Sequence, residues 1–92
     1  MKVAFEQCAF DDFTQWAATD KKIHKRIVSL ITDTLRRPYV GIGKPEPLRH
    51  ELRGYWSRRI TDEHRLVYKV EGDMLVIIAC RYHYHLDKAR GG

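Results

Sequence analysis

The sequence predicts an α+β domain, with two N-terminal helices packed on one face of a small, mainly antiparallel sheet. Three observations predict this fold. Apolar residues recur at helical spacing before Pro38, short β-like segments follow it, and turn residues separate those segments. A chain of 92 residues is long enough for one modest core and too short for two. We therefore expect one domain.

The first predicted elements are a short strand and a helix. Residues 2–5 are expected to form the strand. Residues 6–18 are expected to be helical, because apolar side chains recur there at helical spacing: Phe10, Phe13, and Trp16 or Ala17.

The second helix is better defined than the first. Thr19 or Asp20 is its expected cap, and Pro38 stops it. One face is an apolar stripe of Ile23, Ile27, Leu30, Ile31 and Leu35. The other face is basic and carries Lys21, Lys22, Lys25 and Arg26. That basic face is either a solvated surface or a track for a phosphate backbone.

Beyond Pro38 the pattern is that of a loop followed by an antiparallel meander. Residues 39–45 contain two glycines and read as the loop. The expected strands are residues 46–52, 55–60, 64–70 and 74–82. Gly54, residues 61–63 and the pair Gly72-Asp73 supply the turns.

The composition is that of a folded, basic domain. Hydrophobic residues make up 43% of the chain and charged residues 32%, which is ordinary for a folded soluble protein rather than a disordered one. The formal net charge of +5 makes a polyanion a reasonable partner, although many small basic domains bind no nucleic acid. Charge alone leaves both alternatives open.

The cysteines and the apolar runs bear on the compartment. Cys8 and Cys80 lie in apolar contexts without metal-ligand spacing, so we expect buried free thiols in a reducing compartment. We expect no signal peptide, because the first residues continue directly into a charged segment. The longest apolar run, residues 74–80, is far too short to span a membrane. The expectation is a cytoplasmic protein without a membrane partner.

Two arginines are expected to face each other on the sheet. If Ile60 pairs with His64 across the turn at residues 61–63, then Arg59 lies opposite Arg65. Like charges in directly opposite positions are destabilising. Either an anion normally lies between the two arginines, or Asp62, Glu63 or another acid neutralises them. The sequence leaves both interpretations open.

A glutamate and the end of the last strand complete a possible site. Pro45 and Pro47 stiffen the backbone around Glu46 and deny it a helix, as a carboxylate that must point in one direction requires. Antiparallel order returns residues 81–84 towards Arg65, but the register of the preceding turn decides whether His83 or Tyr84 shares its face.

These side chains fit RNA cleavage better than metal binding. A glutamate, a histidine, two arginines and aromatic rings supply a general base, a general acid, phosphate clamps and a stacking ring. His83 and His85 with the distant Cys80 match a zinc site poorly.

Four motifs carry a resemblance to a known family: GKPEPL (43–48), WSRRIT (56–61), EHRLVY (63–68) and ACRYHY (79–84). They closely resemble YoeB-type toxins of the RelE superfamily, which are ribosome-dependent mRNA endonucleases of type II toxin–antitoxin systems. The similarity extends over residues 1–84 without an evident gap. It implies a RelE-like toxin domain over 1–84, and the polar, glycine-ended residues 85–92 are expected to be a disordered tail.

The resemblance also implies roles for individual residues. Glu46 matches the family's general base, His83 its general acid, and Arg65 the arginine that stabilises the transition state. The implied substrate-binding residues are Arg49, Arg59 and Tyr84. Arg49 stands where the family commonly has lysine, and a planar guanidinium is not equivalent to an ammonium group. The implied reaction is attack of a ribose 2′-hydroxyl on the adjacent phosphate, without metal or cofactor.

The implied partners are the ribosome with its mRNA and a cognate YefM-like antitoxin, whose acidic disordered segment would cover the active site. Family members also tend to form homodimers, and no patch in the sequence decides whether this chain does. Two alternatives remain: a ParE-like inhibitor of DNA gyrase, and a non-catalytic module that binds nucleic acid or an antitoxin. The combination of Glu46, Arg65 and His83 argues against the gyrase inhibitor, and the non-catalytic module stays open as the other class.

Overall fold

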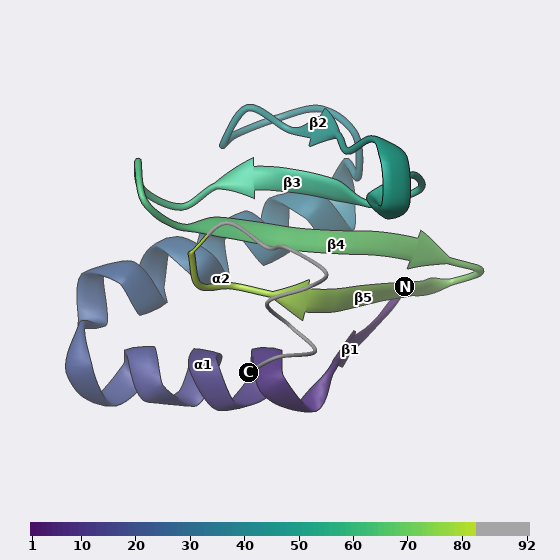
Figure 1. Cartoon of the computed structure of the whole chain (residues 1–92). Coiled ribbons are helices and arrows are strands. Elements are labelled where there is room, and N and C mark those ends of the chain that lie inside the picture. The colour runs from purple at the N-terminus through teal and green to yellow at the C-terminus, as the bar shows by residue number, and fades with distance from the viewer. Residues whose placement is uncertain (83–92) are drawn as a thin grey trace.

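The computed structural model of the protein describes residues 1–82. The chain begins with strand β1 (Lys2–Phe5), which leads into helices α1 (Gln7–Thr19) and α2 (Lys21–Arg36). Strands β2 (Glu46–Pro47), β3 (Trp56–Arg59), β4 (Arg65–Glu71) and β5 (Met74–Ala79) follow, with a short 3₁₀ helix, η1 (His50–Leu52), between β2 and β3. Figure 1 shows both helices on the same side of the sheet, which confirms the predicted α+β class.

The sheet has five strands in the order β1-β5-β4-β3-β2. β1 pairs with β5 in parallel, and the other pairs are antiparallel. The mainly antiparallel sheet is therefore confirmed. The parallel pair is possible because both helices lie between β1 and the rest of the sheet in the chain, which gives the crossover that parallel strands need.

Alternation along the central strands gives the sheet two apolar faces. Leu66 and Tyr68 of β4, with Leu75 and Ile77 of β5, pack against the helices in the main core. From α2 this core receives Ile27, Leu30 and Ile31, which confirms the predicted apolar stripe. The intervening residues form a smaller cluster on the other face: Val67, Val76, Ile78 and Ala79.

Helix α2 begins and ends as its sequence predicts. Of the two candidate caps, Asp20 is the one used, since its carboxylate accepts a hydrogen bond from the Ile23 amide at 3.2 Å. The helix ends at Arg36, and Pro38 follows two residues later. Three residues of its basic face, Lys21, Lys22 and Lys25, are exposed to solvent.

Three expectations are wrong in detail. The strand expected over 46–52 ends at Pro47, because His50 adopts a left-handed φ of 58° and starts η1. The strand expected over 74–82 ends at Ala79, and the chain turns at Tyr82, where φ is 54°. Cys80 is buried as expected, but Cys8 is exposed. The buried position of α1 is Ala9, and successive side chains of a helix point about 100° apart, so the neighbouring Cys8 is exposed.

Neither helix in residues 1–82 is long and apolar enough to cross a membrane.

Candidate active site

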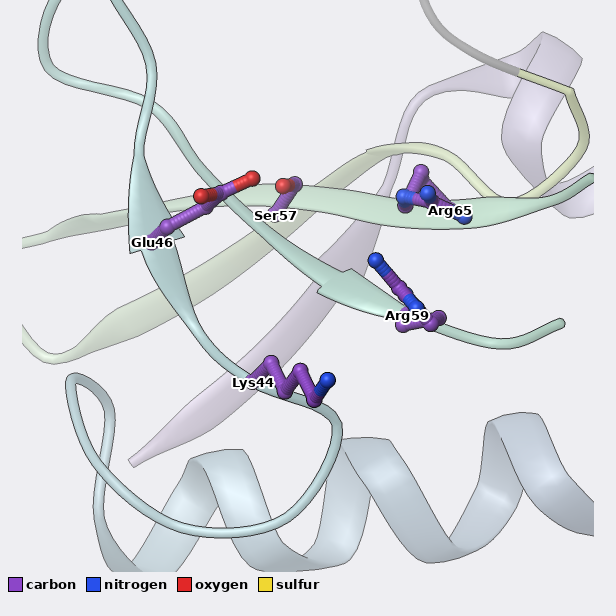
Figure 2. Close-up of a pocket in the computed structure, with 5 residues that line it drawn as sticks. All are labelled: Lys44, Glu46, Ser57, Arg59 and Arg65. Carbon is purple, nitrogen blue, oxygen red and sulfur yellow. The ribbon is translucent and has the colours of Figure 1, made fainter. Parts of the chain in front are cut away.

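A small basic pocket lies where β2, β3 and β4 meet, and Figure 2 shows the side chains that line it. They are Lys44, Glu46, Ser57, Arg59 and Arg65. Its volume of about 60 Å³ is well below the several hundred Å³ of a site that encloses a whole small molecule. The pocket is therefore suited to one small anionic group of a ligand that extends beyond it.

Glu46 reaches the pocket from the short strand β2. It pairs with Ser57 of β3, so the two side chains share a face of the sheet. Figure 2 shows the Glu46 side chain pointing towards Ser57. Glu46 is exposed, and it forms no ion pair with another residue of the described chain. Its carboxylate is thus available to a bound ligand.

Arg59 and Arg65 are directly opposite each other on β3 and β4, as the sequence predicts. Figure 2 shows the Arg59 side chain reaching from β3 towards β4, where Arg65 lies. Arg65 Nη1 donates to backbone carbonyls of the β3–β4 turn, at 2.7 Å to Thr61 and 3.2 Å to Asp62. Arg59 Nη1 lies 3.9 Å from the fully exposed Asp62 carboxylate.

This geometry bears on the two interpretations of the arginine pair. The acid of the turn nearest to Arg59 is Asp62, at 3.9 Å and fully exposed to solvent. An exposed ion pair of this kind contributes little to stability. Arg65 has no carboxylate partner in residues 1–82. Two cations therefore remain close together with most of their charge uncompensated, a setting that favours a bound anion.

The loop that carries Lys44 is tied to β3 immediately beside the pocket. The Arg59 amide donates to the Gly43 carbonyl at 2.6 Å. Gly43 has a φ of +81°, and a Cβ there would lie 2.7 Å from the Leu30 side chain, so this position requires glycine. The close approach of loop, helix and strand sets the path on which Lys44 enters the site.

A buried arginine anchors the rest of that loop. Arg58 is fully buried, and its guanidinium donates to Asp33 Oδ2 at 2.7 Å. It also donates to the carbonyls of the loop after α2, those of Arg37, Val40 and Ile42, at 2.6 to 3.0 Å. Its Nε lies 3.3 Å from the Tyr68 hydroxyl. One side chain thus fixes the segment that leads from α2 to Lys44 and Glu46.

Asp33 is the carboxylate of this network. Hydrogen bonds from Arg37, then Arg58, and then the Ile42 amide hold the pKa of Asp33 well below its usual range. The group therefore stays ionised while the protein is folded, and it neutralises the buried guanidinium of Arg58.

The structure brings together three of the six predicted site residues. Glu46, Arg59 and Arg65 line the pocket. Arg49 is exposed at the start of η1 and does not line this pocket. The predictions for His83 and Tyr84, and for the tail, fall outside the described residues.

Sequence reasoning missed Lys44 and Ser57 in the pocket and Arg58 beneath it. Strand alternation offers the signal for two of them. If Arg59 faces the pocket, Ser57 must face it too, and Arg58 must point to the helices. Among residues 1–82, no three His, Cys, Asp or Glu side chains gather in a way that could hold a metal ion.

Comparison with known proteins identifies the family. The model of the YoeB-like toxins of bacterial type II toxin–antitoxin systems matches residues 5–84. The chain belongs to this family. It is 58% identical over 84 residues to the YoeB toxin of Escherichia coli K12, an alignment that covers 91% of this chain and 100% of that protein.

Solved structures of YoeB-type toxins share the fold. A YoeB/ParE toxin from Agrobacterium tumefaciens aligns with a TM-score of 0.89 and 46% identity, over 91% of this chain and 100% of the other. Two Staphylococcus aureus structures, a heterotetrameric YoeB–YefM toxin–antitoxin complex and a YoeB dimer, each align with a TM-score of 0.85 and 44% identity. Each covers 91% of this chain and 98% of the other. This YoeB-family chain is therefore a toxin of a type II toxin–antitoxin system.

Proposed function

We propose that this toxin is a metal-independent endoribonuclease that cuts mRNA in the decoding site of the ribosome and so inhibits translation. The observation that carries the proposal is that Glu46, the two opposed arginines and Lys44 line one pocket. A base next to three cations suits a reaction in which a hydroxyl loses its proton while negative charge builds up on a phosphate. The family assignment supports the same reading.

In the proposed reaction, Glu46 accepts the proton of a ribose 2′-hydroxyl, whose oxygen then attacks the adjacent phosphorus. The bond from phosphorus to the 5′-oxygen breaks, and that oxygen takes a proton from His83. The products are a 2′,3′-cyclic phosphate and a 5′-hydroxyl end. Arg59, Arg65 and Lys44 stabilise the charge on the phosphate oxygens, and donors of this kind are each worth roughly 10²–10³ in rate.

Substrate ordering explains the need for a ribosome. A carboxylate is a weak base, and a pocket of about 60 Å³ holds one phosphate without fixing the neighbouring ribose. Holding reacting groups in the correct geometry contributes up to ~7–11 kcal/mol in the best intramolecular cases. We infer that the ribosome supplies this ordering by holding the mRNA. The basic surface of the toxin would attract the toxin to ribosomal RNA.

The same basic pocket supports an antitoxin partner. The S. aureus relative occurs in a YoeB–YefM complex and as a dimer. We infer that a YefM-like antitoxin binds this chain, and that an acidic, disordered segment covers the pocket and neutralises its arginines. From the dimer of that relative we infer that this chain also forms a homodimer.

The deciding experiment compares cleavage on and off the ribosome. Purified protein is added to ribosomes programmed with a defined mRNA, and to the same mRNA alone, and the ends of the products are mapped. We expect cutting on the ribosome, with cyclic phosphate and 5′-hydroxyl ends, and almost none of the free RNA. Equal cutting of both would remove the ordering argument.

Two matched variants test the assigned base. Glu46→Gln should lower the cleavage step by roughly 10²–10⁴. Glu51→Gln, at an exposed glutamate of η1 that does not line the pocket, should cut like the unchanged protein. Intact mRNA together with inhibition of DNA gyrase would contradict the proposal in favour of the ParE-like alternative.

A further inference from the structure

The backbone at Tyr82 is held in an unfavourable conformation. Its φ of 54° is left-handed, a region that side-chain-bearing residues adopt only where their surroundings enforce it. Both polar groups of its main chain are engaged. Tyr82 N donates to His64 Nδ1 at 2.8 Å, and Tyr82 O accepts from the Arg65 amide at 3.2 Å. Strain that is enforced in this way often marks a functional position.

The His64 ring is buried and fixed in its orientation. Its side chain is 8% exposed. Trp16 of α1 packs against it edge-on, with ring centres 4.9 Å apart, and the Tyr82 ring lies 5.0 Å away. Because a backbone amide can only donate, Nδ1 must be unprotonated, and in the neutral ring the proton is on Nε2. That nitrogen lies 3.7 Å from Glu63 Oε1.

His64 also contacts the arginine side of the pocket. Its carbonyl accepts hydrogen bonds from Arg65 Nη1 at 3.1 Å, Ile60 N at 3.0 Å and Thr61 N at 3.2 Å. The residue is therefore bonded through its main chain to a guanidinium that lines the pocket. Through its side chain it is bonded to the amide of Tyr82. No other side chain in residues 1–82 donates to or accepts from the Tyr82 main chain.

We propose that His64 is a positioning residue. Its unprotonated Nδ1 fixes the left-handed turn at Tyr82, whose carbonyl accepts from the Arg65 amide, and the contact thereby holds Arg65 in place in the pocket. This inference deepens the proposed function and, for its activity readout, rests on it. A ring that merely fills space would be replaced adequately by phenylalanine. A ring that supplies an acceptor would not, and asparagine would restore the acceptor, because its Oδ1 stands at the position of Nδ1.

The matched variants are therefore His64→Phe, which keeps the ring and loses the acceptor, and His64→Asn, which keeps the acceptor and loses the ring. On programmed ribosomes we expect His64→Phe to lower turnover by about 10²-fold at unchanged half-saturating concentration, as a small misplacement of a reacting group does. His64→Asn should recover most of that loss. Wild-type turnover in His64→Phe, or equal loss in both variants, would overturn the proposal.

A spectroscopic readout needs no RNA. In ¹⁵N NMR of the wild-type protein we expect the neutral His64 ring to be the tautomer with a protonated Nε2 and an unprotonated Nδ1. We also expect the Tyr82 amide to be protected from hydrogen exchange in the wild type and in His64→Asn, and unprotected in His64→Phe. A protonated Nδ1, or unchanged protection in His64→Phe, would refute the turn clamp. If the wild type fails to cut mRNA while these signatures hold, the proposed function is wrong and the positioning contact stands.

Discussion

Replacing the buried Arg58 by methionine should destabilise the protein severely. Methionine keeps much of the stem and removes the guanidinium, so the carbonyls of Arg37, Val40 and Ile42 lose a buried donor. Removing one partner of a buried ion pair typically costs about 3–5 kcal/mol. The free energy of unfolding of an ordinary domain is about 5–15 kcal/mol. The change should therefore remove about a fifth or more of the total.

Urea unfolding followed by tryptophan fluorescence measures this loss, with heat unfolding as a second assay. A cost of about 3–5 kcal/mol corresponds to a fall in Tm of at least about 12 °C in a domain of this size. The control is Arg59→Met, one residue along the same strand, where the side chain is 45% exposed. That variant should stay within about 0.5 kcal/mol of the unchanged protein.

Two further measurements separate the network from burial alone. Arg58→Lys should recover little of the stability, because a lysine amine cannot match the planar fork that reaches several acceptors at once. Hydrogen exchange at the Ile42 amide, which donates to Asp33 Oδ2 at 3.0 Å, should speed up in Arg58→Met and not in Arg59→Met. Equal stability of the Arg58 and Arg59 variants would refute the claim that Arg58 anchors the loop.

Four other predictions follow from the same contacts. Hydrogen bonds hold the pKa of Asp33 below its usual range, so the ionised group stabilises the folded state at pH values above that range, and this stabilisation is lost as the pH falls towards the lower pKa of the folded state. The urea concentration at the unfolding midpoint should therefore decrease as the pH is lowered below about 4, and this dependence on pH should be weaker in Asp33→Asn. Burial raises the pKa of Cys80 to about 12, so a thiol reagent near pH ~8 should label the exposed Cys8 and reach Cys80 only on unfolding, as mass spectrometry would show. Arg65→Ala should lower turnover on ribosomes more than ribosome binding, since its proposed contribution is to the transition state; lost binding at unchanged turnover would make it a docking residue. A chain ended after Tyr84 should cut mRNA nearly as well as the full chain, and strong loss would give residues 85–92 a role.

The parts of the fold that follow a repeating rule were predictable. Helix α2 was predicted from its apolar stripe and from Pro38, because both depend on local geometry. The opposition of Arg59 and Arg65 was predictable because a short turn leaves little freedom in the register. The strand ends were not, since left-handed φ values at His50 and Tyr82 are exceptions that residue type does not announce.

The residues missed in the site share a different cause. A buried arginine runs against the rule that charged side chains stay at the surface, so Arg58 is interpretable only when its acceptors are known. Most of those acceptors are backbone carbonyls, which carry no sequence signal. Lys44 enters the pocket through a left-handed φ of 52°, which no pattern in the loop indicates. Such features emerge from tertiary packing rather than from periodicity.

The rigidity of the pocket bears on what the ribosome would contribute under the proposed function. Arg58 fixes the loop that leads to Glu46, and turn carbonyls hold Arg65 at 2.7 Å and 3.2 Å before any ligand binds. Glu46 and Arg65 are therefore held in position without a partner. The order that is missing on free RNA is therefore in the substrate, whose ribose and phosphate must be held in line for attack. A loosened loop, as in Arg58→Met, should accordingly impair cleavage on the ribosome as well, because ordering the mRNA cannot replace a base that is no longer held in place.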